Sequence, residues 1–370
     1  MLRCCHSRHT HPNRHQTSGP IHVAATAAEN TSPPTPSTNC STTSSPPPEA
    51  SAPPIGGTRL NLRSGPERSR VGRRIPSPGI RVEVEPGVRL FVDVVGSGLR
   101  PDDREMVPKP TLLFLHGGPG SDHSSFRPYV DRFADSHQVL LVDHRGNGRS
   151  DGWGDPSGWN LDTWADDVVR LCDALDVVRP VVVGLSFGGF VAIRYGARNP
   201  EHAAGIVLAS TKARSHTEES AARFRALGGA AAEASFRRVY QDRDLSTEAW
   251  LDYLRTNLRL YNPTPSPFGS ARTIMNLELL VDFTGGEHVG MDLRDDVTSF
   301  AAPTLVLAGS EDPMTPPCCS EEIAELLPGD LGRLEIVEGA GHGTFRDRPE
   351  ETEAILREFL ASEAVAARAS

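Results

Sequence analysis

The chain has 370 residues, of which 38% are apolar and 23% are charged, with 34 glycines and 31 prolines. This composition excludes a mini-protein, a collagen and a polytopic membrane protein. Residues 1–75 carry nine arginines and three acids, a net +6, so residues 76–370 carry −16 within a total of −10. An acidic body gives no electrostatic support for binding nucleic acid, and we expect no such partner.

Residues 1–75 differ in composition from the rest of the chain. They hold 11 of the 31 prolines and 19 serines and threonines, about 40% of the stretch, and cannot bury enough apolar surface to offset their ordering entropy. We predict a disordered tail. Residues 21–28 are too short and too polar for a signal-peptide core, and no run approaches the roughly 18 apolar residues of a membrane span. The six cysteines are few and their placement argues against a disulfide framework, so we expect a reduced, cytoplasmic protein with no membrane partner.

The folded part begins with alternating apolar residues. Residues 80–84 and 88–94 have a period of two around Pro86 and Gly87, which predicts a β-hairpin at a sheet edge. Residues 111–115 are a continuous apolar run, which is typical of a strand covered on both faces. Helical and strand patterns then alternate, with helices at 124–134, 161–175 and 187–198 and strands at 139–142, 180–183 and 205–208.

The alternation stops after residue 210 and resumes near residue 300. Between them, residues 211–300 show only helical or irregular patterns, which indicates an inserted helical cap. The last part predicts strands at 303–308 and 333–337 and helices at 320–327 and 350–361. We therefore predict an α/β fold with a doubly wound, mostly parallel sheet and an antiparallel N-terminal hairpin. Its core comprises residues 76–210 and 301–370, and the cap comprises residues 211–300.

The strand at 180–183 runs into a G-x-S-x-G sequence at residues 184–188, followed by a helix. Glycines on either side of Ser186 permit a sharp turn that exposes the serine hydroxyl, as a nucleophile requires. The alternative is a strand-to-helix turn that glycines merely soften. The pentapeptide alone does not decide between the two.

Two further strand ends favour the catalytic interpretation. Asp312 follows the strand at 303–308, and His342 follows the strand at 333–337. Because reactive groups collect at the carboxyl ends of parallel strands, Ser186, Asp312 and His342 are predicted to meet there as nucleophile, acid and base. Glu311 is the obvious rival for the acid.

The strand at 111–115 ends in the sequence His-Gly-Gly-Pro-Gly. An N–H of Gly117 or Gly118, together with the N–H of Phe187, can form an oxyanion hole. A phosphate cradle is the competing interpretation, but no Lys-Ser/Thr pair follows the glycines and their spacing is not G-x-G-x-x-G. For residues 143–150, which follow the next strand, we predict a structural role.

Together these motifs resemble those of the α/β-hydrolase superfamily, and the turn at 116–120 resembles the proline iminopeptidase (prolyl aminopeptidase) branch of serine peptidases. The motifs lie at residues 116–120, 143–150, 184–188, 309–312 and 339–342, and the resemblance covers about residues 79–362. It implies a serine hydrolase that needs no metal or cofactor and has a helical cap over its site. The implied substrate is a small molecule or a short peptide, from which members of this branch remove an N-terminal residue, commonly proline.

Caps of that branch supply acidic groups that bind the free amine of the substrate. By the resemblance, Glu287 is our candidate for this role, with Glu218 and Glu219 as further candidates. The branch usually has Trp and Ser where this chain has Phe187 and Gly189. A carboxylesterase or amide hydrolase of the same fold therefore stays open as an alternative, as does a non-catalytic binding protein.

Overall fold

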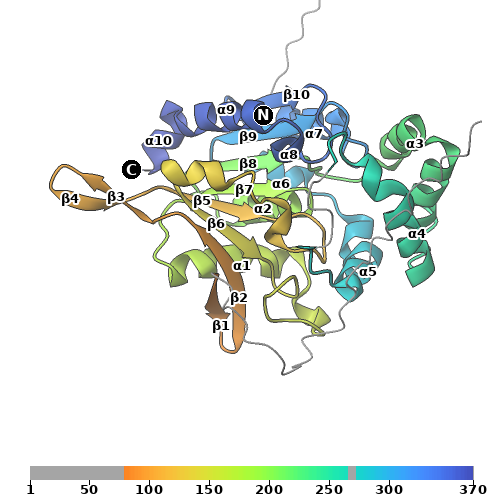
Figure 1. Cartoon of the computed structure of the whole chain (residues 1–370), viewed down its shortest axis with the longest axis horizontal. Coiled ribbons are helices and arrows are strands. Elements are labelled where there is room, and N and C mark those ends of the chain that lie inside the picture. Colours follow the sequence, from red (N-terminus) through yellow and green to blue (C-terminus); the bar gives the residue numbers. More distant parts are fainter. Residues whose placement is uncertain (1–78, 266–271, 370) are drawn as a thin grey trace, which may run out of the picture. The chain divides into compact units, whose positions relative to one another are not determined.

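The structure is a computed structural model that describes residues 79–265 and 272–369. The predicted tail at residues 1–75 lies outside the described residues. All elements below lie within the described residues (Figure 1).

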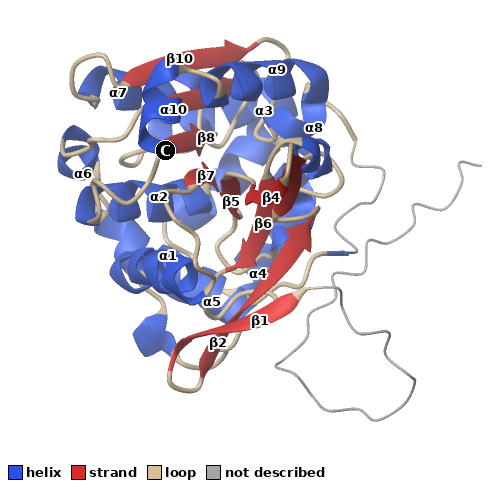
Figure 2. Ribbon diagram, turned by 90° about the vertical axis from the view of Figure 1, so that its left-hand side faces the viewer, coloured by secondary structure: helices blue, strands red, loops and turns tan. Residues whose placement is uncertain are grey.

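Eight strands of the described residues form one sheet, and its type confirms the predicted fold class. From one edge to the other the strands are β1 (Ile80–Glu85), β2 (Val88–Val95), β6 (Gln138–Asp143), β5 (Thr111–Leu115), β7 (Val181–Leu185), β8 (Gly205–Ala209), β9 (Thr304–Gly309) and β10 (Gly332–Val337). The β1–β2 hairpin joins β6 in antiparallel register, and all other neighbours are parallel. Figure 2 shows the sheet from β10 at the top to the hairpin at the bottom.

The unbroken apolar run in β5 reflects burial on both faces. Leu113 and Leu115 pack into one apolar cluster, and Leu112 and Phe114 pack into a second. Successive strand side chains point to opposite faces, so the two clusters cover the two sides of the sheet. The absence of alternation in the sequence is therefore explained by this double burial.

Helices from the middle and from the C-terminal part of the chain cover these faces. The first cluster is shared with α1 (Leu161–Ala174), α2 (Phe187–Arg198), α6 (Arg294–Thr298) and α7 (Pro317–Leu326). The second is shared with α8 (Thr344–Asp347), α9 (Pro349–Leu360) and α10 (Glu363–Ala369). The predicted helices at 161–175, 187–198, 320–327 and 350–361 are thus confirmed, with boundaries that shift by up to three residues.

The predicted helix at residues 124–134 is wrong. The structure has two short 3-10 turns instead, η1 (His123–Ser125) and η2 (Asp131–Asp135). Pro128 lies between them, where it has no N–H to donate and disfavours a helical conformation of the residue before it. Phe126 and Phe133 are nevertheless buried against the sheet, which accounts for the misleading apolar spacing.

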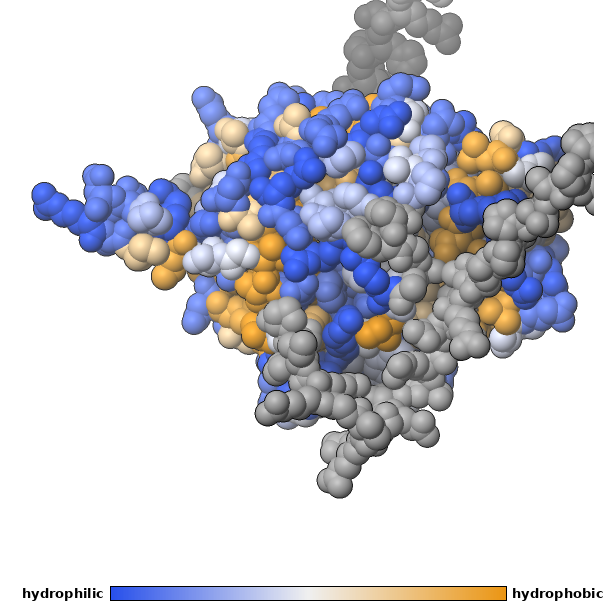
Figure 3. Space-filling view, viewed as in Figure 1, coloured by the Kyte–Doolittle hydropathy of each residue, from blue (hydrophilic) through white to orange (hydrophobic). Residues whose placement is uncertain are grey.

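A second hairpin was not predicted from the sequence. It consists of β3 (Leu99–Asp102) and β4 (Glu105–Pro108), and almost all of its residues are exposed. Figure 1 shows it projecting at the left, and in Figure 3 this projection is mainly hydrophilic with a few apolar residues. Because neither face is buried, its strands carry no apolar alternation that could have revealed them.

The described residues between β8 and β9 form helices and 3-10 turns joined by irregular segments. They contain α3 (Thr217–Tyr240), α4 (Thr247–Asn257), α5 (Leu277–Gly285) and α6, with 3-10 turns η4 (Leu258–Leu260) and η6 (Glu287–Gly290). Figure 1 shows α3 and α4 to the right of the sheet. Aromatic residues of α3 and α4, among them Phe224, Trp250 and Tyr253, form an apolar cluster of their own. The domain boundaries at residues 210 and 300 stay a prediction.

Candidate active site

Ser186 lies on a strained turn between β7 and α2. Its φ is +54° and its ψ is −115°, a left-handed conformation that costs a non-glycine residue on the order of 1–3 kcal/mol. Glycine is required beside it because a Cβ on Gly184 would collide with the carbonyl of Gly188. A Cβ on Gly188 would in turn collide with the carbonyl of Leu115. The G-x-S-x-G spacing thus reflects close backbone packing around one half-buried serine that lines a pocket.

His342 and Asp312 meet on the loops that follow β10 and β9. The His342 Nδ1 atom lies 2.8 Å from the Asp312 Oδ2 atom. Asp312 is fully buried, and it also accepts hydrogen bonds from the Met314 and Thr315 peptide N–H groups and from the Thr315 hydroxyl, at 2.8–3.0 Å. This geometry keeps the Nδ1 proton of the imidazole on the aspartate side and leaves Nε2 available for a proton from another group.

The rival acid Glu311 lies in a different environment. Its side chain is 44% exposed and approaches the Arg223 guanidinium at 3.4 Å. Of the two adjacent carboxylates, the structure brings only Asp312 to His342.

The glycines after β5 lie beside Ser186. A Cβ on Gly117 would be 3.2 Å from the Ser186 Cβ atom, and Gly118 lines the same pocket as the serine. Phe187 is the first residue of α2, and N–H groups in the first turn of a helix have no partner within the helix. The structure thus brings all three predicted oxyanion-hole residues together around Ser186.

Two residues that the sequence did not single out hold this glycine loop. The His116 Nδ1 atom donates to the Gly117 carbonyl at 2.7 Å, while its Nε2 accepts from the His144 peptide N–H at 3.2 Å. Burial lowers the pKa of His116, which favours the neutral tautomer that these two bonds need. The Asn147 side-chain oxygen accepts from the Gly120 peptide N–H at 2.7 Å. Residues 143–150 therefore have the structural role predicted for them.

A buried charge cluster fixes the start of that loop. The His123 Nδ1 atom lies 2.6 Å from the Asp143 Oδ1 atom, and its Nε2 lies 3.4 Å from Asp93. The other Asp143 oxygen accepts from the Arg149 peptide N–H at 2.8 Å. Burial disfavours charge on His123, but the bonds to Asp143 and Asp93 outweigh it and raise the pKa of His123 to about 9.

We expect this cluster to make stability depend on pH. The pKa of His123 is about 9 in the folded chain and about 6.5 when unfolded, so its stabilising charge is fully present below pH 6.5 and is lost as pH rises through 9. The free energy of unfolding should fall by about 3 kcal/mol over this window. Urea titrations at a series of pH values will measure the decline, and His123→Gln should abolish it.

His137→Gln is the matched control. Burial lowers the pKa of His137, so this histidine is neutral throughout the same window and its replacement should preserve the wild-type slope. An unchanged slope in His123→Gln would contradict the assignment.

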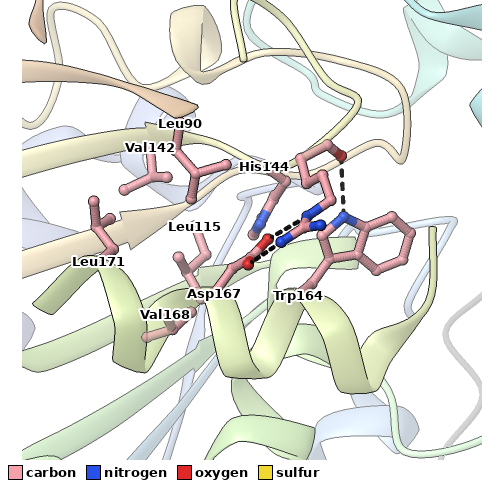
Figure 4. A pocket seen from close by; sticks show the side chains of 9 residues that line it. Leu90, Leu115, Val142, His144, Trp164, Asp167, Val168 and Leu171 are labelled. Carbon is pink, nitrogen blue, oxygen red and sulfur yellow. Dashed lines mark hydrogen bonds and ion pairs between the residues drawn. The ribbon is translucent and has the colours of Figure 1, made fainter. Parts of the chain in front are cut away.

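Figure 4 shows the cavity behind this loop. The Arg145 guanidinium forms a bidentate ion pair with Asp167 of α1, at 2.9 and 2.6 Å. A further bond of 2.8 Å joins Arg145 to Glu85. The Trp164 indole N–H donates to the Arg145 carbonyl at 3.0 Å. These contacts join the loop to α1 and the β1 strand, and the cavity that they border does not include Ser186.

A second pocket contains Ser186. Among the described residues its lining consists of Gly118, Pro119, Ser186, Phe190, Lys212, Tyr240, Phe283, Thr284, His288, Met314 and Thr315. These residues come from the glycine loop, α2, the end of β8, the helical segment and the loop that carries Asp312. Lys212 is the charged residue in this set, and no carboxylate is among these residues.

The three acids predicted to bind an amine lie elsewhere. Glu287 accepts a hydrogen bond from the Leu161 peptide N–H at the start of α1, at 2.9 Å. Glu218 is exposed and pairs with Arg237 at 2.8 Å, and Glu219 is exposed near His216. The structure does not bring any of them into the lining of the Ser186 pocket.

Among the described residues, one group has possible metal-ligand atoms within 4.8 Å of one another, namely His216, Cys318 and Cys319. His216 Nε2 is engaged by Glu322 at 3.0 Å, and burial raises the pKa of both thiols, which disfavours thiolate ligands. We assign no metal to this group. In the same part of the chain, every helix is too short or too polar to cross a membrane.

Comparison with known proteins identifies relatives across this region. Residues 110–349 match a family model described as alpha/beta hydrolase fold. The chain is 28% identical over 271 residues to the putative carbamate hydrolase RutD of Caulobacter sp. (strain K31), covering 68% of this chain and 95% of that protein. It is 27% identical over 270 residues to a proline iminopeptidase of Clostridioides difficile (strain 630), covering 68% and 90% respectively.

Among solved structures, the chain is similar to a proline iminopeptidase from Mycobacterium smegmatis. The TM-score is 0.62 at 24% sequence identity, and the match covers 78% of this chain and 99% of that structure. At this identity the likeness concerns the fold.

Proposed function

The chain belongs to the α/β hydrolase fold family and is a hydrolase, and from this premise we propose that it cleaves esters or amides by a serine mechanism. The observation that carries the proposal is the strained backbone of Ser186, which lies at the end of β7 and lines a pocket. A positive φ at a serine on such a turn is typical of a nucleophile. The 2.8 Å contact between His342 and Asp312 supports the assignment of base and acid.

In the proposed mechanism, the Ser186 Oγ attacks the substrate carbonyl carbon while His342 Nε2 takes the hydroxyl proton. The resulting imidazolium is stabilised by Asp312 and passes its proton to the leaving group as the bond to the carbonyl carbon breaks. A water then attacks the acyl-enzyme, with His342 accepting its proton and returning a proton to Ser186. The products are a carboxylic acid and an alcohol or amine.

The negative oxygen of each tetrahedral intermediate needs donors that are already in place. We assign this role to the peptide N–H of Phe187 and an N–H of Gly117 or Gly118. The hydrogen bonds that His116 donates and Asn147 accepts support the assignment. They fix the glycine loop, so its N–H groups need no reorganisation during the reaction.

Two substrate classes are candidates. A prolyl aminopeptidase is favoured by the turn at 116–120 and by the relatives named proline iminopeptidase. A carboxylesterase or amide hydrolase is favoured by the pocket, since no carboxylate among its described lining residues can pair with the ammonium of an N-terminal residue. We infer that the second class is the better match, with the prolyl aminopeptidase as the alternative.

A fluorophosphonate probe and a substrate panel test this proposal. We expect the probe to modify Ser186, as mapped by peptide mass spectrometry, and 4-nitrophenyl esters to be hydrolysed with a kcat/KM at least about tenfold above that of proline 4-nitroanilide. Glu287→Ala should lower stability through the lost bond to Leu161 and leave unchanged the ratio of kcat/KM for the esters to that for proline 4-nitroanilide. A ratio that favours the prolyl amide and depends on Glu287 would establish the alternative, and an unmodified Ser186 would exclude the serine mechanism.

A further inference from the structure

Lys212 lies beside the serine turn. Its backbone follows β8, where the Ser186 peptide N–H donates to the Ala209 carbonyl at 2.9 Å and the Thr211 hydroxyl donates to the Ser186 carbonyl at 2.8 Å. Lys212 is the next residue after Thr211, and its side chain lines the same pocket as Ser186. It is one of only two lysines in the chain, against 36 arginines.

The Lys212 side chain is buried and has no partner for its charge. It is 3% exposed, and within residues 79–265 and 272–369 it makes no hydrogen bond or ion pair. Burial lowers the pKa of Lys212, and the nearby Cys319 and Asp312 oppose this shift only in part. Four other donors already occupy the Asp312 carboxylate. A buried ammonium without an anion is costly, and buried lysines are ordinarily paired.

The neighbours of Lys212 do not compensate its charge. Burial, together with the charges of Lys212 and Arg243, lowers the pKa of His288 to about 3, so this histidine is neutral at pH 7. Burial raises the pKa values of Cys319 and Tyr240, which keeps both protonated. Lys212 is thus the one amine among neutral polar and aromatic groups of the pocket, and an anion bound beside it would favour its charged form.

We propose that Lys212 is a specificity-determining residue that binds a carboxylate of the substrate, so that the proposed hydrolase acts on esters or amides carrying an anionic group near the scissile carbonyl. The inference rests on the proposed function and narrows it. It follows from the ammonium and the nucleophile lining one pocket that holds no competing acid among its described residues. A substrate carboxylate would provide the missing counter-ion and a charge-assisted hydrogen bond.

The test compares substrates that differ only in charge. The first pair is 4-nitrophenyl hydrogen adipate and 4-nitrophenyl hexanoate, in which a carboxylate replaces the terminal methyl group of the acyl chain. The second pair is 3-carboxyphenyl hexanoate and 3-methylphenyl hexanoate, in which the same replacement is made on the leaving group. We expect the full-length chain to prefer the carboxylate member of at least one pair by about tenfold or more in kcat/KM. Lys212→Met should remove that preference, and Lys212→Arg should retain part of it.

Lys109→Met is the matched control, because Lys109 donates to the Ala134 carbonyl at 2.7 Å and does not line the pocket. In this variant the preference in kcat/KM for the carboxylate substrates should equal that of the wild type. A second measurement needs no variant of Lys212: adipate should slow fluorophosphonate labelling of wild-type Ser186 at concentrations at which hexanamide does not.

The outcomes separate the two levels of inference. In one outcome Ser186 is labelled and the neutral esters are hydrolysed, but kcat/KM is the same for both members of each substrate pair and adipate gives no protection. This outcome overturns the role of Lys212 and leaves the hydrolase proposal standing. An unlabelled Ser186 with no turnover of any ester overturns the hydrolase proposal, and with it this inference.

Discussion

Ser186→Ala is expected to lower kcat for ester hydrolysis by about four orders of magnitude or more and to abolish labelling by a fluorophosphonate. The substitution removes the atom that would form the acyl-enzyme and changes little else. Among the described residues none forms a hydrogen bond with the Ser186 hydroxyl, so its loss leaves no buried donor or acceptor unpaired. Single-turnover kinetics and mass spectrometry of the labelled chain measure the effect.

Ser210→Ala is a closely matched control. Ser210 is buried at the end of the neighbouring strand β8 and has a φ of +45°, so it shares the backbone strain and the position of Ser186 relative to its strand. Its replacement should change kcat by less than about threefold. If Ser186→Ala kept its turnover and Ser210→Ala lost it, the nucleophile would be Ser210 after β8 and not Ser186 after β7.

Asp312→Asn should lower kcat by about three to four orders of magnitude with little change in KM. The neutral amide cannot stabilise an imidazolium at His342. In one orientation the NH₂ of the amide points at the Met314 and Thr315 peptide N–H donors, and in the other it points at the Nδ1–H of His342 and disfavours the tautomer that the base needs. Steady-state kinetics beside a thermal unfolding curve separates the loss of turnover from any loss of folded chain.

Glu311→Gln controls for charge at the adjacent residue. The Glu311 side chain is 44% exposed and lies 3.4 Å from the partly buried Arg223 guanidinium, away from His342, so its removal should change kcat by less than about twofold. If Glu311→Gln were the inactive variant, the acid of the site would have to be reassigned.

The sequence predicted the fold, and it predicted Ser186, Asp312 and His342 as a site because each follows a strand of a parallel sheet. Such strands place their ends on one edge, whatever the surface sequence. The choice between Glu311 and Asp312 required the structure, since adjacent residues on a loop point in different directions and only side-chain contacts distinguish them. The helix predicted at 124–134 failed where Pro128 overrode an apolar spacing.

Lys212 illustrates a different limit of sequence reasoning. A lone lysine after a strand is ordinarily a solvated surface residue. Only its burial, its place beside Ser186 and the lack of a partner among the described residues mark it as a candidate for binding. Glu287 is the reverse case, because its position in the chain suggested binding whereas its carboxylate contacts the start of α1.

The helical segment between β8 and β9 is tied to the very loops that carry the proposed chemistry. The Tyr261 carbonyl accepts from the His342 peptide N–H at 2.7 Å, and the Asn262 side chain accepts from the Gly343 N–H at 2.6 Å. Asn276 donates through its backbone to the Gly120 carbonyl, also at 2.6 Å. A chimera that exchanged this segment for that of a relative would therefore disturb the imidazole and the glycine turn unless its backbone kept the positions of Tyr261 and Asn276 and Asn262 kept its side-chain acceptor. Evolutionary changes of this segment that alter substrate selectivity would therefore also alter catalysis, through the contacts of Tyr261, Asn262 and Asn276.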